Sequence, residues 1–462
     1  MDERQKIILI LTSIGSFLTP FMGSSINIAI PEIGHEFLSS AILLSWVTTS
    51  YLLTSAILIV PMGRLADIRG RVGIFLSGVA IYTAGSLICT IAPSAEWLIV
   101  FRIIQGIGGA MLYATSIAII TSVFHAKERG MALGINVAFI YTGLTIGPFL
   151  GGIVTEFFGW RSIFYLNVLI GLFVLLAGMK YLKVPEIKEE MTRFDLPGSV
   201  LYAVTIFLLM IGFQELPSEP GIVLFALAGV SFIAFVYQEN RAEYPVIRLS
   251  LFTKNRVFAF SNLAALINYS STYAIGFLLS IYLQNVKGFS PFSAGTILIA
   301  QPIMQALFSP AMGKLSDKYP SRLLATAGMA MITIGLVPFA NLGLETSVTF
   351  IIADLAFLGL GYALFSSPNT HAVMDSVNER CYGVASGILG TMRLSGMMVS
   401  MGISMFAFSL TIGRDPLSIT DLAGLVSAIE IAFAIFAALC ALGTIASYVR
   451  NPKKQNRTED SS

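Results

Sequence analysis

The sequence contains few charged residues, few cysteines and few histidines, and each shortage excludes a class of protein. Only 12% of its 462 residues are charged and 55% are hydrophobic, whereas roughly a quarter of the residues in soluble domains are charged. A water-soluble protein of this composition would expose too much apolar surface, so lipid must cover it. The three cysteines and three histidines have no ligand spacing, so we expect neither a disulfide framework nor a metal site. The net charge of +2 gives no reason to expect nucleic-acid binding.

Long apolar runs predict fourteen transmembrane helices, because a spanning helix needs about 20 predominantly apolar residues. Clusters of charge, proline and glycine separate the runs. The first run is too long for a signal peptide and is predicted to be retained as a helix. The predicted helices cover residues 7–30, 43–62, 72–91, 97–123, 130–155, 162–182, 196–213, 221–237, 257–284, 291–312, 321–341, 347–368, 380–407 and 425–448.

The distribution of lysine and arginine predicts the orientation in the membrane. Cytoplasmic loops are enriched in these residues, and most of the 28 lie in loops on the side of the two termini. The opposite loops contain only Arg161, Lys287 and Arg414. We therefore expect a multi-pass protein of the cell (plasma) membrane with both termini in the cytoplasm.

An internal repeat divides the chain into two similar halves. The segment Gly63-Arg-Leu-Ala-Asp67 recurs as Gly313-Lys-Leu-Ser-Asp317, each after the second helix of its half. The two copies are 250 residues apart. Six helices need fewer residues than that, so we expect two further helices between the halves. The predicted organisation is a six-helix bundle at 1–183, linkers with two inserted helices at 184–256, a second six-helix bundle at 257–449 and a cytoplasmic tail at 450–462. Parallel repeats are typical of transporters that rock two bundles about a central site.

Two loop segments carry an acidic residue inside a basic cluster. In Gly63-x-Leu-x-Asp67-x-x-Gly70-Arg71, the glycines permit close turns, and Asp67 can cap a helix or pair with a neighbouring arginine. The alternative is an ordinary positively charged loop, but the acid recurs in the second half as Asp317, after Gly313. We predict that both loops act as conformational latches.

Two predicted helices carry further motifs. Arg102-x-x-Gln105-Gly106-x-Gly108-Gly109 places a charge inside the membrane, where it faces a cavity or a partner unless it snorkels to the surface. Gly143-x-x-x-Gly147-Pro148-x-x-Gly151-Gly152 puts small residues along one helix face, beside a proline kink. The corresponding positions of the second half lack these small residues, which favours a structural bias of one half over duplicated packing.

These segments, in this order, resemble the signature motifs of the major facilitator superfamily, and the Gly-Pro segment resembles its antiporter motif. The likeness covers essentially the whole chain and, with fourteen helices, is closest to the fourteen-spanner drug:proton antiporters. The resemblance implies the major facilitator fold and a secondary active transporter that is not an enzyme. One position departs from it, because many members carry an aspartate five residues before the asparagine that matches Asn27, and Met22 stands here. This departure weakens the prediction of specificity for cationic drugs.

Further charged residues lie inside the predicted helices of the second half. Counted from the cytoplasmic helix ends at about 1.5 Å per residue, Asp354 and Arg393 lie at similar depth on consecutive helices, so we expect that they can pair. The pair is either a permanent structural ion pair or a switch in which Asp354 takes up a proton when Arg393 moves away. Arg102 and Glu430 are further candidates for proton coupling, unless Glu430 lies near the outer surface.

Polar and aromatic side chains predict a substrate cavity among the first, fourth, ninth and twelfth helices. They suit a mostly apolar pocket with a few polar anchors; hydrogen bonding between helices is the alternative. The candidates are Asn27, Gln105, Asn262, Asn268, Tyr269, Tyr273, Gln301 and Gln305.

The predicted function is secondary active transport, in which protons are exchanged for hydrophobic or amphipathic compounds by alternating access. The chain has no Walker motif, so ATP does not drive transport directly, and no cofactor is expected. The alternatives are an exporter or facilitator of one specific metabolite and, remotely, a polytopic membrane enzyme, for which the sequence has no nucleophile or metal motif. The expected partners are the bilayer, a small amphipathic substrate and protons, with no nucleic acid, and the protein is expected to be a monomer.

Overall fold

The computed structural model describes residues 3–124, 126–183, 195–216, 218–242, 245, 247, 249, 252–253, 255–316, 318–377, 382–413 and 422–449. Every regular element within these ranges is helical, and 14 segments are long and apolar enough to cross a membrane. The all-helical fold class and the fourteen predicted spans are therefore confirmed.

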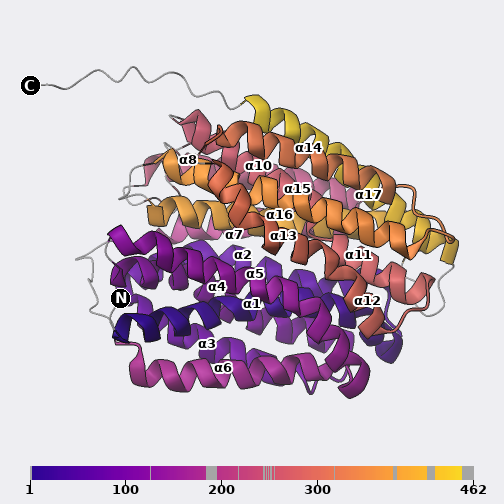
Figure 1. Cartoon of the computed structure of the whole chain (residues 1–462), viewed down its shortest axis with the longest axis horizontal. Helices are drawn as coiled ribbons and strands as arrows, with labels where there is room; N and C mark the ends of the chain where they lie inside the picture. Colours follow the sequence, from indigo (N-terminus) through magenta and orange to yellow (C-terminus); the bar gives the residue numbers. More distant parts are fainter. Residues whose placement is uncertain are drawn as a thin grey trace, which may run out of the picture.

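The first six spans form the lower half of the molecule in Figure 1, coloured from indigo to magenta. They are α1 (Glu3–Phe37), α2 (Ala41–Arg69), α3 (Arg71–Cys89), α4 (Ala95–Val123), α5 (Ala126–Phe158) and α6 (Arg161–Tyr181). The Ser40 hydroxyl begins α2 by accepting the N–H of Leu43 at 3.3 Å. Gly70 separates α2 from α3 with a φ of 106°, a conformation that favours glycine.

The rest of the chain comprises two inserted helices and the second half. The elements are α7 (Leu196–Glu215), α8 (Glu219–Arg241), α10 (Arg256–Thr272), α11 (Ile275–Ile281), η1 (Tyr282–Val286), α12 (Pro291–Leu298), α13 (Ala300–Ser316), α14 (Ser321–Phe339), α15 (Val348–Asp375), α16 (Tyr382–Thr411) and α17 (Leu422–Val449). One span is divided into α10, α11 and η1, and another into α12 and α13. Pro302 explains the second break, because it has no N–H to donate to the carbonyl of Leu298.

The start of α1 and the end of α17 lie at the same end of the bundle, on the left of Figure 1. We call it the termini end and the opposite end the far end. An even number of spans requires this arrangement.

Hydrogen bonds at the far end join the two halves. The Gln284 side-chain Nε2 donates to the carbonyl of Ile28 at 2.9 Å, which connects η1 to α1. The N–H of Phe292, in the first turn of α12, donates to Glu156 Oε2 of α5 at 3.0 Å. A carboxylate at a helix N-terminus is favoured by the helix dipole, so α5 anchors the start of α12.

The inserted helix α7 contacts both halves. The Tyr202 hydroxyl of α7 donates to the carbonyl of Ala56 in α2 at 3.0 Å. The Ser409 hydroxyl of α16 donates to the carbonyl of Leu216, directly after α7, at 3.0 Å. Helix α7 therefore packs across the line where α2 and α16 meet.

Candidate transport site

Five tyrosines from both halves gather between the halves, and we call them the tyrosine cluster. They are Tyr113 on α4, Tyr141 on α5, Tyr269 near the end of α10, Tyr273 directly after α10, and Tyr362 on α15. The Tyr269 side chain is close enough to interact electrostatically with Tyr113, Tyr141 and Tyr362. The Tyr141 and Ser366 hydroxyls are hydrogen bonded at 2.7 Å, which joins α5 directly to α15. Rings with polar tips suit an amphipathic ligand, because one surface offers both apolar contact and hydrogen bonds.

Arg393 on α16 supplies a positive charge next to the tyrosine cluster. Its Nη2 donates to the Thr370 hydroxyl of α15 at 2.8 Å, and its guanidinium carbon lies 5.7 Å from the centre of the Tyr269 ring. Its Nε is buried and has no hydrogen-bond partner. The residues that the structure describes include no ion pair of Arg393.

The predicted pairing of Asp354 with Arg393 is wrong. Arg393 binds Thr370, which lies 16 residues after Asp354 on the continuous helix α15, a separation of about 24 Å along the axis. The prediction placed the end of this helix at residue 368, whereas the helix runs through Pro368 to Asp375. Asp354 is therefore closer to the far end than the prediction assumed.

Asp354 instead faces α14. One of its carboxylate oxygens, Oδ1, lies 3.3 Å from the position that a Cβ would take on Gly335. The other, Oδ2, is buried without a hydrogen-bond partner. Glu430, the other acidic candidate, is half-buried on α17. The structure thus places Asp354 between α14 and α15, away from the tyrosine cluster.

Arg102 is fully buried inside the first half. Its Nε donates to the carbonyl of Val47 in α2 at 2.9 Å, its Nη1 binds the Gln105 side chain, and its guanidinium carbon lies 4.5 Å from the centre of the Tyr51 ring. Gln105 in turn donates to Ser86 of α3 at 2.7 Å. The prediction that Gln105 lines the substrate cavity is therefore not supported, because this residue lies in the interface of α3 and α4 and positions Arg102.

Arg102 nevertheless interacts beyond its own half. It is an electrostatic neighbour of Tyr273, which follows α10 in the second half. Its Nη2 is buried without a hydrogen-bond partner. A second guanidinium, from the first half, therefore acts on the tyrosine cluster.

The predicted amide side chains occupy different surroundings. The Nδ2 of Asn27 lies 3.6 Å from the position of a Cβ on Gly276, so Asn27 faces the other half. Asn262 donates to the carbonyl of Phe258 in its own helix at 2.9 Å. Both amide atoms of Asn268 are buried without a partner. Buried polar groups are normally satisfied, so Asn268 is available to a ligand or to water.

Gln301 and Gln305 share one face of α13, as their spacing predicts. The Nε2 of Gln301 points to Oε1 of Gln305 at 3.5 Å, the upper limit for a hydrogen bond. The Gln305 side chain also interacts with the Tyr141 hydroxyl of the first half. This pair thus contributes polar groups to the boundary of the tyrosine cluster.

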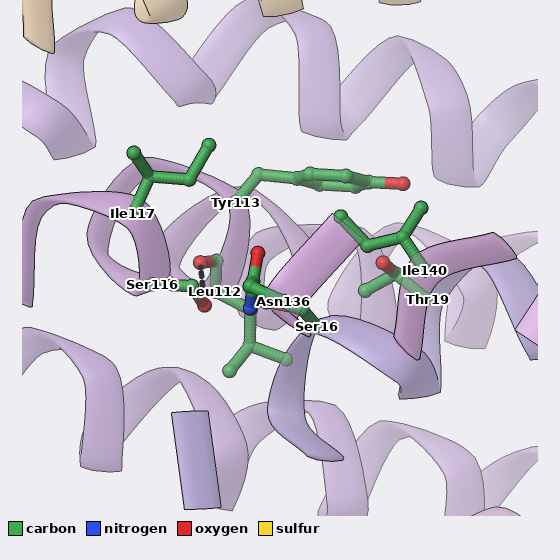
Figure 2. A pocket seen from close by; sticks show the side chains of 8 residues that line it. All are labelled: Ser16, Thr19, Leu112, Tyr113, Ser116, Ile117, Asn136 and Ile140. Atoms are coloured by element: carbon green, nitrogen blue, oxygen red, sulfur yellow. Dashed lines mark hydrogen bonds between the residues drawn. The ribbon is translucent and has the colours of Figure 1, made fainter. Parts of the chain in front are cut away.

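A small pocket opens within the first half beside Tyr113. Figure 2 shows Tyr113 and Ile117 on one side of the pocket and Asn136 on the other. Asn136 Nδ2 donates to the Ser16 hydroxyl at 2.9 Å, and Asn136 Oδ1 is buried without a partner. The lining residues are Ser16, Thr19, Leu112, Tyr113, Ser116, Ile117, Asn136 and Ile140.

Sequence reasoning missed Asn136, Tyr141 and Thr370 in this region. Asn136 and Tyr141 could have been identified from the sequence, because both precede Gly143 by no more than two helical turns on a helix with a glycine face. A polar side chain on such a helix is more informative than one on a helix without close packing. Thr370 carried no such signal.

The glycine motif of α5 packs against two different partners. Positions for a Cβ on Gly143, Gly147 and Gly151 all meet α1, at Phe17, Ser24 and Ser25 respectively. The Ser25 hydroxyl also donates to the carbonyl of Gly147 at 2.9 Å.

The end of the same motif contacts the second half. A Cβ on Gly152 would lie 2.7 Å from the carbonyl oxygen of Pro291, and a Cβ on Gly295 would meet the carbonyl of Pro148. The backbones of α5 and α12 therefore approach closely between the halves. The glycines of this motif therefore pack on α1 within the half and on α12 of the other half.

An ion pair joins the end of α2 to the start of α3, and the segment predicted as a loop is helical except at Gly70. Arg71 Nη2 lies 2.9 Å from Asp67 Oδ1, and Arg71 Nη1 donates to the carbonyl of Ala118 in α4 at 3.1 Å. Of the two roles predicted for Asp67, the structure contains the pairing with an arginine. Gly63 lies beside α4 and Gly313 beside Ser367 of α15, while Asp317 is outside the described residues.

Comparison with known proteins identifies the family. The family model of the Major Facilitator Superfamily matches residues 12–401 and 261–462. The riboflavin transporter RibZ of Clostridioides difficile (strain 630) is 34% identical over 445 residues, which cover 96% of this chain and 97% of RibZ. The multidrug resistance protein Stp of Mycobacterium tuberculosis (strain ATCC 25618 / H37Rv) is 32% identical over 87% of this chain and 76% of Stp.

A solved structure shares the fold. The crystal structure of a bacterial homolog of the human lysosomal transporter Spinster has a TM-score of 0.71 and 15% identity, and the match covers 97% of both chains. The family match, the relatives and this fold agree with the all-helical membrane architecture. The chain belongs to the major facilitator superfamily and is a secondary transporter of the membrane, not an enzyme.

Proposed function

We propose that this transporter exports amphipathic aromatic compounds in exchange for protons, by alternating access to the tyrosine cluster. It acts as a monomer in the cell membrane, with the termini end in the cytoplasm. The observation that carries the proposal is the position of the cluster, which joins α4 and α5 to α10 and α15 between the two halves. Rocking of the halves would expose such a site to either side of the membrane.

The chemistry of the cluster supports an amphipathic aromatic substrate. Tyrosine rings stack on planar molecules and keep a polar tip for hydrogen bonds. Asn268 and Asn27 add buried amide atoms that have no partner in the protein. A ligand that supplies those hydrogen bonds would gain affinity, because buried polar groups are costly when unsatisfied.

Asp354 is our first candidate for the proton carrier. A carboxylate within a membrane helix is expensive to keep charged unless it is paired, and Asp354 Oδ2 is buried without a partner. Its position against Gly335 of α14 would couple protonation to the packing of α14 on α15. Arg102 and Glu430 remain further candidates.

A second candidate function is transport of one metabolite. RibZ is a riboflavin transporter by name and matches nearly the full length of this chain, whereas Stp is named as a multidrug resistance protein. A flavin is a planar aromatic compound and suits the tyrosine cluster as well as a drug does. Competition between riboflavin and amphipathic dyes would distinguish a narrow site from a broad one.

The test is proton movement in proteoliposomes with an imposed pH gradient, for wild type and Asp354→Asn. We expect riboflavin or a transported dye to trigger proton flux in wild type and no flux in the variant. A matched control is Asp375→Asn, which removes an exposed carboxylate from the end of the same helix. Full gradient-driven transport by Asp354→Asn would contradict the assignment, and substrate transport without proton flux in wild type would contradict proton coupling.

A further inference from the structure

We propose that Arg393, Thr370 and Tyr269 form an anion-binding subsite, so that the preferred ligand of the tyrosine cluster is a planar aromatic molecule with a negatively charged group. The inference rests on the transport function proposed above, because it names the charge of the transported compound.

The first argument is the state of the Arg393 side chain. A guanidinium has five N–H donors, and among the described residues Arg393 makes one hydrogen bond, from Nη2 to Thr370, while its Nε is buried without a partner. A charge within a membrane protein normally has a partner of opposite sign. A carboxylate, sulfonate or phosphate of a ligand would supply the missing charge and accept the remaining hydrogen bonds.

The second argument is the absence of competing acids among the described residues. Asp354 is about 24 Å from Thr370 along α15. Asp375 lies nearer, five residues beyond Thr370, but its side chain is 61% exposed and its Oδ2 lies 3.0 Å from Nδ1 of His371.

The third argument is the aromatic surface around the charge. Tyr269 lies under the guanidinium, and Tyr113 and Tyr141 are electrostatic neighbours of Arg393 from the first half. Arginine and tyrosine both stack on planar rings. An aromatic anion can therefore place its ring among the tyrosines and its charged group on Arg393, and Arg102 adds positive potential near Tyr273.

The experiment is equilibrium binding of two xanthene dyes of similar size to the purified full-length protein, followed by fluorescence anisotropy. Carboxyfluorescein is the anionic probe and rhodamine 123 the cationic probe. We expect wild type to bind carboxyfluorescein at least about tenfold more tightly than rhodamine 123. Arg393→Gln should lose about tenfold or more in affinity for carboxyfluorescein, as expected when a charge-assisted hydrogen bond is removed, without losing rhodamine 123.

Two further variants make the result specific. Arg393→Lys keeps the charge but lacks the planar fork, so it should retain part of the preference for the anion. Lys180→Gln removes an exposed positive charge at the end of α6 and should bind both dyes as wild type does. If Arg393→Gln does not yield folded protein, Arg393→Lys and Thr370→Val decide, because both should weaken carboxyfluorescein binding selectively.

Three results would overturn the inference: no saturable binding of carboxyfluorescein to wild type, equal affinity for the two dyes, or unchanged carboxyfluorescein binding in the folded Arg393 variants. The assay needs no gradient, so it separates this inference from the proposed function. Anion preference without proton flux would contradict only the coupling, and proton-coupled transport by a protein that binds the two dyes with equal affinity would contradict only the anion subsite.

Discussion

Three charged side chains inside the membrane lie in three different environments. Helices α2 and α3 surround Arg102, α14 lies beside Asp354, and the tyrosine cluster lies beside Arg393. Sequence alone could not separate Asp354 from Arg393, because the depth of a residue depends on where its helix ends. Pro368 suggested a helix end at residue 368, but α15 continues to Asp375.

We predict that the substitutions Asp354→Asn and Arg393→Gln have additive effects on stability. Residues more than about 10 Å apart usually add within roughly 0.5 kcal/mol, and α15 separates Asp354 from the partner of Arg393 by about 24 Å. Thermal unfolding of the two single variants and the double variant in detergent measures the coupling energy. If one substitution rescued the other by about 1 kcal/mol or more, Asp354 and Arg393 would have to form an ion pair, and the prediction would be wrong.

At the scale of helices, the apolar runs predicted every span, since about 20 apolar residues have no other stable arrangement in a bilayer. They could not predict the rotation of a helix, which depends on contacts with neighbours. Gln105 therefore faced α3 instead of the space between the halves, and Tyr113 and Tyr362 could not be distinguished from tyrosines at the lipid surface. The α5 glycines were identified, but their two partners were visible only in the structure.

The packing of α5 on α1 gives a prediction for Gly147. Its Cβ position meets the Ser24 side chain, so Gly147→Val should force α5 away from α1 and lower the free energy of unfolding by about 1–3 kcal/mol. The purified variant should unfold at a lower temperature and transport dye more slowly than wild type.

The matched control for Gly147 is Gly229→Ala in α8. No atom lies within 4 Å of its Cβ position, and alanine is the better helix former by about 1 kcal/mol. This variant should be at least as stable as wild type and should transport normally. Equal stability of wild type and Gly147→Val would contradict the close packing of α5 on α1.

At the scale of the whole molecule, the two halves meet at the far end through α5 and α12. Gly152→Val places side-chain atoms against the carbonyl of Pro291, so it should shift the population toward conformations with the far end open. Spin labels at Ile91→Cys and Leu344→Cys, which are 71% and 51% exposed, would report a longer distance in this variant. An unchanged distance would show that this contact does not hold the far end closed.

The most direct test of the account is whether transport requires the halves to separate at the tyrosine cluster. Tyr141→Cys and Ser366→Cys, introduced into a chain whose native cysteines are replaced by serine, can be joined by a short cleavable bis-thiosulfonate linker across the hydrogen bond that now connects α5 to α15. In proteoliposomes we predict that linkage stops dye transport and that reduction restores it, with each single-cysteine variant unaffected by the linker. Undiminished transport by fully linked protein would contradict alternating access through this site.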